Sequence, residues 1–130
     1  MATLKISDLS VGDWVEWTVY DKSYDILVTQ ITDTLIRGVH DGIEYGMLLK
    51  QISPIPITPE ILEANEIHRT YEDDNYAIFR GDGLWAVKYT DGDWELSTPP
   101  VCRVDIKFIH QLQHALRLAG VDKEIVMPKK

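Results

Sequence analysis

The chain has 130 residues, of which 45% are hydrophobic and 26% charged, and its formal net charge is −8. This composition is typical of a folded globular protein, and the length suits one compact core or two very small lobes. No apolar run approaches the ~20 residues of a membrane span. The opening MATLKISDLS lacks the apolar stretch of a signal peptide, and the single cysteine, Cys102, suits a reducing compartment. We therefore expect a cytoplasmic protein that is not bound to a membrane.

Charge is distributed unevenly along the chain. Residues 1–57 carry 4 basic and 8 acidic side chains, residues 58–96 carry 3 and 10, and residues 97–130 carry 6 and 3. Binding of nucleic acid over the whole surface is disfavoured, because neutralising phosphates requires clustered lysine and arginine. Any anionic ligand is expected at the basic C-terminal quarter.

The first 57 residues have the pattern of short strands joined by tight turns. Residues 14–20 alternate with period two, and β-rich runs follow at 24–31, 35–40 and 43–50. Asp41-Gly42 is a two-residue hairpin signal between the last two runs. Four such strands predict a small SH3-like β-barrel or a curled meander.

A proline-rich connector, SPIPITP at residues 53–59, separates the two halves. Its alternating prolines cannot occupy a central strand. A short helix is predicted next, with Thr58 as N-cap and Pro59 at its first position, ending near Asn65. We expect lobes at residues 1–57 and 58–130, and leave open whether they share one core.

The second half predicts a β-meander followed by a helix. Runs at 76–80, 84–90 and 93–97 are separated by Asp-Gly turns, and Pro99-Pro100 is expected to end that sheet. Residues 108–119 place apolar side chains on one broad arc of a helix, with Asp105 as the expected N-cap and Gly120 as the stop. The predicted fold class is α+β.

The polar side of this C-terminal helix is the first candidate site. The cations that we expect to pair with an anion or a partner are Arg103, Lys107, His110, His114 and Arg117. The alternative is an ordinary solvated helix face. His110 and His114 have metal-binding spacing, but the run HQLQH lacks an acidic residue and no third ligand is evident, so we expect no metal.

Aromatic side chains are expected to complete the same site. Trp85 or Tyr89 would stack on the base of a bound nucleotide while the cations pair with its phosphates. Core packing explains most of the four tryptophans. Trp14 and Trp17 have opposite parity on one predicted strand, so one of them is expected to face out of the core. The sequence contains no G-x-S-x-G, P-loop, Rossmann or CxxC pattern, and we predict no catalytic residues and no cofactor.

Two segments carry a family resemblance. ISPIPITPEILEAN at residues 52–65 and FIHQLQHALRLAGVDKEI at residues 108–125 resemble small proteins encoded by phages and prophages of Bacteroidetes-type bacteria, as does LSVGDWV at residues 9–15. Members of that group often have Asn-Gly where this chain has Asn65-Glu66. The resemblance implies a phage accessory protein acting in the host bacterial cytoplasm.

The function expected from these features is binding rather than catalysis. The leading hypothesis is a counter-defence or host-takeover factor that sequesters a small anionic ligand, such as a signalling nucleotide, or a host protein. The alternative is a structural or adaptor protein of the phage particle or replication machinery. A homo-oligomer is compatible with either, and binding of nucleic acid is disfavoured.

Overall fold

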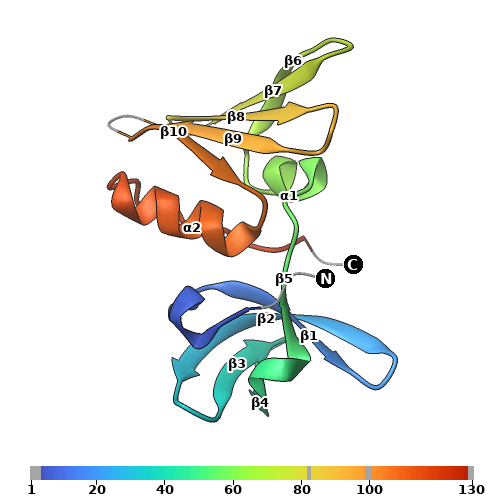
Figure 1. Cartoon of the computed structure of the whole chain (residues 1–130), viewed down its shortest axis with the longest axis vertical. Helices are drawn as coiled ribbons and strands as arrows, with labels where there is room; N and C mark the ends of the chain where they lie inside the picture. The colour runs from blue at the N-terminus through green and yellow to red at the C-terminus, as the bar shows by residue number, and fades with distance from the viewer. Residues whose placement is uncertain (1–3, 82, 99–100, 129–130) are drawn as a thin grey trace. The chain divides into compact units, whose positions relative to one another are not determined.

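The computed structural model describes residues 4–81, 83–98 and 101–128 and has an α+β fold with two five-stranded antiparallel sheets (Figure 1). The chain divides into two compact units, Met1–Ile55 and Pro56–Lys130. The division falls inside the proline-rich connector, two residues before the boundary expected from the sequence. Each unit contains one sheet. Both α-helices belong to the second unit, and two short 3-10 helices, labelled η, belong to the first.

The first unit is a curled antiparallel sheet with strand order β4-β3-β2-β1-β5. Its elements are η1 (Ile6–Asp8), β1 (Trp14–Val19), β2 (Lys22–Ile31), β3 (Ile36–His40), β4 (Ile43–Met47), η2 (Leu49–Gln51) and β5 (Ile52–Pro54). The four expected strands are present. The described strands form no closed barrel, so the SH3-like barrel is not confirmed. The connector supplies β5 at the sheet edge, where Pro54 is tolerated because an edge strand has backbone groups outside the ladder.

One face of this sheet forms the core of the first unit. Val15, Ile26, Ile36 and Met47 are almost completely buried and come from four different strands.

The hairpin predicted at Asp41-Gly42 is confirmed, since both residues have positive φ (50° and 78°), as a two-residue turn of this kind requires.

The second unit pairs its strands in the order β10-β9-β8-β7-β6. Its elements are α1 (Pro59–Ala64), β6 (His68–Glu72), β7 (Tyr76–Gly81), β8 (Leu84–Tyr89), β9 (Trp94–Thr98), β10 (Val101–Ile106) and α2 (Ile109–Leu118). The expectation that the sheet ends at Pro99-Pro100 is wrong, because β10 adds a fifth strand beside β9. The two prolines themselves lie outside the described residues.

Helix α1 begins and ends as the sequence predicts. The Thr58 hydroxyl accepts a hydrogen bond from the backbone N–H of Ile61 at 3.3 Å, and Pro59 occupies the first turn. Asn65 is the C-cap, and Glu66 follows with φ of 63°. A glutamate in this left-handed conformation is strained, because its Cβ crowds the backbone.

Replacing Glu66 with glycine should therefore stabilise the second unit by about 0.5–1 kcal/mol, the left-handed strain relieved less the extra chain entropy of glycine. Urea denaturation monitored by circular dichroism measures the effect. Glu60→Gly is the matched control, because Glu60 has helical geometry in the first turn of α1, where glycine is unfavourable. A lower midpoint for Glu66→Gly would contradict the prediction.

Helix α2 starts later than expected. Asp105 is not the N-cap, because β10 continues to Ile106 and pairs Asp105 with Glu95. The Gln111 side-chain oxygen instead accepts hydrogen bonds from the backbone N–H groups of Lys107 (2.8 Å) and Phe108 (3.1 Å). The predicted stop at Gly120 is confirmed by its φ of 75°.

Both helices lie on the same side of the second sheet (Figure 1). The side chains buried on that side come from the strands and from α2, and include Phe79, Leu84, Leu96, Leu112 and Leu116. Among the described residues of the second unit, no helix lies on the opposite face of the sheet. That helix-free face positions the candidate site.

Candidate functional site

The helix-free face is built from two paired strands whose side chains alternate. On β7, Ala77 and Phe79 are buried and their neighbours point the other way; on β8, Leu84 and Ala86 are buried. The outward residues form three cross-strand pairs, which we call the aromatic face: Tyr76 with Tyr89, Ile78 with Val87, and Arg80 with Trp85.

The pair of Arg80 and Trp85 is the most exposed part of the aromatic face. Trp85 is 45% exposed, which is high for the largest apolar side chain. The Arg80 guanidinium lies 3.9 Å from the centre of the Trp85 ring, in cation–π contact. The indole is thus held in one orientation while a large part of its surface remains in water.

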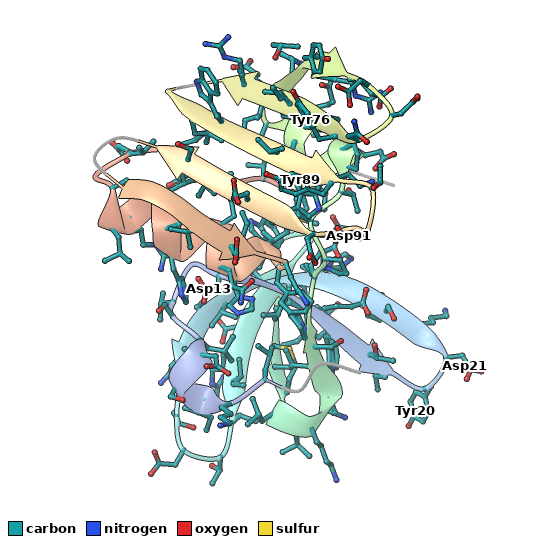
Figure 2. The ribbon with its side chains drawn as sticks, turned by 45° about the horizontal axis from the view of Figure 1, so that its top comes forward. Asp13, Tyr20, Asp21, Tyr76, Tyr89 and Asp91 are labelled. Atoms are coloured by element: carbon teal, nitrogen blue, oxygen red, sulfur yellow. The ribbon has the colours of Figure 1, made fainter. Side chains whose placement is uncertain are left out.

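Tyrosines occupy the other end of the aromatic face (Figure 2). Tyr76 and Tyr89 lie on neighbouring strands, and the Tyr89 hydroxyl donates to Glu95 on β9 at 3.3 Å. Tyr71 on β6 extends this end, with its ring centre 5.5 Å from that of Tyr76. Three phenol rings therefore border the strip of Ile78 and Val87, and hydrogen bonds fix the hydroxyl groups of Tyr71 and Tyr89.

Acidic turns surround the tyrosine end. Asp73 and Asp74 lie in the turn before β7, and Asp91 and Asp93 lie in the turn after β8. These turns are at the same end of the sheet because β7 and β8 are antiparallel. The aromatic face therefore has an anionic rim at this end, which Asp91 in Figure 2 marks.

Hydrogen bonds fix the charge state of one member of this rim, Asp73. The backbone N–H of Asn75 donates to Asp73 at 2.7 Å and is the main reason that the pKa of Asp73 is lowered; the Tyr71 hydroxyl, which donates at 2.8 Å, adds to the effect. The same bond raises the pKa of Tyr71. Asp73 is thus held ionised and Tyr71 protonated.

A shallow pocket of 390 Å³ lies elsewhere on the second unit, between α1 and β6. Pro59, Glu60, Glu63 and Arg69 line it. The Glu63 carboxylate accepts from the backbone N–H of Arg69 at 2.8 Å and contacts His68, and these partners lower the pKa of Glu63. Because the Glu63 carboxylate already binds Arg69 and His68, it is less available to a ligand, and this pocket is a weaker candidate than the aromatic face.

The residues expected to form one site lie on different parts of the second unit. Trp85 and Tyr89 are on the aromatic face, whereas Lys107, His110, His114 and Arg117 belong to α2 or its start, on the other side of the sheet. Lys107 and Arg117 are exposed. The side chains of Arg103 and Cys102 lie outside the described part of the structure. The described residues of the expected site therefore lie on opposite sides of the second sheet.

The polar side of α2 is less open than its pattern suggests. His110 and Gln113 are buried, and His114 is half-buried. The His110 ring stacks on Phe108 at 6.0 Å and meets His114 edge-on at 5.7 Å. Within the described residues, no group of three His, Cys, Asp or Glu side chains could hold a metal ion. Periodicity alone could not reveal this packing, because it counts both histidines simply as polar.

Arg80 and Tyr76 were missed as candidate residues, although the sequence contains a signal for both. The turn centred on Gly83 sets the hairpin register, and counting back from it pairs Arg80 with Trp85 and Tyr76 with Tyr89. A search for partners of the exposed Trp85 across the hairpin would have identified them.

Comparison of the chain with known protein families, characterised proteins and solved structures finds no match. In the described part of the chain, neither helix is long and apolar enough to cross a membrane.

Proposed function

We propose that this is a non-catalytic binding protein that engages a protein partner through the aromatic face. The observation that carries the proposal is the exposed Trp85 ring, held by Arg80 beside the apolar strip of Ile78 and Val87. Tryptophan, tyrosine and arginine dominate the binding energy of protein interfaces. A preoriented tryptophan also loses little conformational freedom when a partner binds.

The shape and charge of this surface favour a protein over a small anion. Small-molecule sites are usually concave, whereas the aromatic face is the open surface of a sheet. Asp73, Asp74, Asp91 and Asp93 would repel a phosphate group at the tyrosine end. The partner proposed here has an apolar centre and a basic rim facing these four carboxylates.

The resemblance to phage-encoded proteins supports a host protein as the partner, and hence a role in counter-defence or host takeover. An adaptor role within the phage particle would use the same surface.

We also propose that the first unit is a partly open barrel of the SH3 type, because its meander returns β5 to the side of β1. This fold proposal adds no function by itself.

Site-specific photocrosslinking in the bacterial host tests the proposed surface. Trp85 is replaced by p-benzoylphenylalanine, and the matched control places the same photoreactive residue at Tyr20, an aromatic residue of the first unit that is 96% exposed. We expect a discrete, light-dependent protein adduct from position 85 and none from position 20. Adducts of equal yield at both positions, or none at position 85, would refute the proposal.

The identified partner then allows a quantitative test. Trp85→Ala should weaken its binding about 30-fold, as truncation of an interface hot spot does. The thermal midpoint of the variant should change much less than the affinity, because Trp85 lies on the outward face of the sheet and is 45% exposed. Added salt should weaken the wild-type complex if the basic rim is correctly inferred.

A signalling nucleotide is the second candidate, and the contact between Arg80 and Trp85 specifically favours it. An indole and a guanidinium can sandwich or extend a base stack, and Arg80 can also pair with a phosphate. Native mass spectrometry with a panel of cyclic nucleotides tests this directly. A discrete added mass that disappears in Trp85→Ala would support it, whereas an unchanged spectrum across the panel would exclude it for that panel.

A further inference from the structure

The first unit contains a second concentration of aromatic side chains, which is separate from the aromatic face. Trp17, Tyr24, His40 and Tyr45 come from the four consecutive strands β1 to β4, and we call them the aromatic cluster. They extend the same face that buries Val15, Ile26, Ile36 and Met47 in the first unit.

The four rings form an unbroken chain of contacts. The Trp17 ring centre lies 5.2 Å from that of Tyr45 and 5.7 Å from that of Tyr24, and Tyr24 lies 5.2 Å from His40. Adjacent planes are inclined by 40°, 44° and 65° rather than stacked. Because the rings do not cover one another face to face, π surface remains outside the contacts between them.

The aromatic cluster is accessible from solvent. All four residues are only partly buried, in contrast to the apolar core that continues below them. His40 is fixed by a 2.9 Å hydrogen bond between its Nδ1 and the backbone oxygen of Asp25. The Trp17 indole nitrogen is buried and makes no hydrogen bond within the described residues, so packing alone holds this ring.

Two turns at the same end of the sheet each carry a carboxylate, the first of them next to Lys22. The β1–β2 turn carries Asp21, which Figure 2 shows beside Tyr20 at the hairpin tip, and the β3–β4 turn carries Asp41. Both turns lie at the end of the sheet where the aromatic cluster is, because β1 to β4 form a simple antiparallel meander. Asp41 Oδ2 lies 3.6 Å from His40 Nε2. Residues 1–55 carry 8 acidic and only 4 basic side chains.

We propose that the aromatic cluster binds a small quaternary ammonium compound of the choline type. The electron-rich faces of tryptophan and tyrosine attract an organic cation, and alkylated ammonium groups are the cations most easily desolvated against such faces. The carboxylates of the two turns add long-range attraction for positive charge. The three ring contacts span only four side chains, which suits a ligand with a single ammonium group, and the site is independent of the aromatic face.

The four indole N–H signals of the isotope-labelled full chain provide the test, since the sequence has four tryptophans. Choline chloride is titrated at constant ionic strength, and 3,3-dimethylbutan-1-ol serves as the neutral compound of the same shape. We expect a saturable shift of the Trp17 signal with choline, none at Trp85 or Trp94, and no saturable shift with the alcohol. An equal response to both compounds, or shifts spread over all four signals, would overturn the proposal.

Variants separate a binding role from a structural one. Tyr45→Leu should weaken choline binding at least threefold, whereas Tyr45→Phe, which keeps the ring, should retain it; Asp41→Asn should also weaken it. Trp14→Phe, on the opposite face of β1, is the matched control and should bind as the wild type does. If Tyr45→Leu binds choline unchanged, the assignment is wrong. A lysine peptide that displaces choline at lower concentration would also overturn it, by making the occupant a peptide side chain.

Discussion

Replacing Asn65 with alanine should lower the free energy of unfolding of the second unit by about 2–4 kcal/mol. Asn65 is 4% exposed, and its side chain makes three hydrogen bonds to backbone groups. Nδ2 donates to the carbonyl oxygens of Ile61 (2.7 Å) and Val126 (2.8 Å), and Oδ1 accepts from the N–H of Val126 at 2.8 Å. Alanine can make none of these three hydrogen bonds, so the two carbonyl oxygens and the Val126 N–H each lose their Asn65 partner.

The loss should be seen first at the C-terminal segment. The paired bonds to Val126 attach residues 121–128 to the end of α1, and Ile125 beside them is buried. We therefore expect trypsin to cleave Asn65→Ala after Lys123 much faster than it cleaves the wild type. Urea denaturation followed by circular dichroism gives the change in unfolding free energy.

Two further variants make this prediction specific. Asn65→Asp keeps the acceptor for the Val126 N–H but sets a carboxylate against two carbonyl oxygens, so it should be at least as destabilising as alanine at neutral pH. Asn75→Ala, an exposed asparagine in the β6–β7 turn, is the control and should change the unfolding free energy far less. Wild-type proteolysis rates and midpoints for Asn65→Ala would show that the segment is held by other contacts.

The sequence predicts local structure well where a short motif determines it. Thr58 and Pro59 start α1, Gly120 ends α2, and Asp41-Gly42 closes a hairpin, each through its own backbone preferences. Strands β6 and β10 were not predicted. Every residue of β6 is exposed, so the strand lacks the alternating burial from which strands are recognised.

Long-range contacts could not be predicted in the same way. Asn65 reads simply as the end of a helix, because its partner Val126 is 61 residues away. The predicted ligand site combined Trp85 with the cations of α2, since nothing local in the sequence places a helix on one particular face of a sheet. Strand parity and hairpin register, by contrast, would have been sufficient to group Arg80, Trp85, Tyr76 and Tyr89, although only Trp85 and Tyr89 were predicted as site residues.

Gly38 lies where β3 comes too close to β2 for a side chain, a contact that the sequence alone does not reveal. It lies in the middle of β3, opposite Val28 on β2 and Tyr45 on β4. A Cβ atom there would overlap the Ile26 side chain and would lie 2.9 Å from the backbone oxygen of Leu27. Because the second obstacle is backbone, the strand itself would have to move.

Gly38→Ala should therefore lower the free energy of unfolding of the first unit by about 2–3 kcal/mol, as overpacking a core does. Gly46→Ala is the matched control on the adjacent strand, where the nearest atoms to the added Cβ belong to the Leu35 side chain, at 3.6 Å, an ordinary contact. That variant should be as stable as the wild type or slightly more stable, because alanine suits a strand better than glycine. Chemical denaturation monitored at the Trp17 indole signal distinguishes them. Equal midpoints for the two variants would mean that β2 and β3 move apart easily and that the added Cβ atom at position 38 is accommodated without a loss of stability.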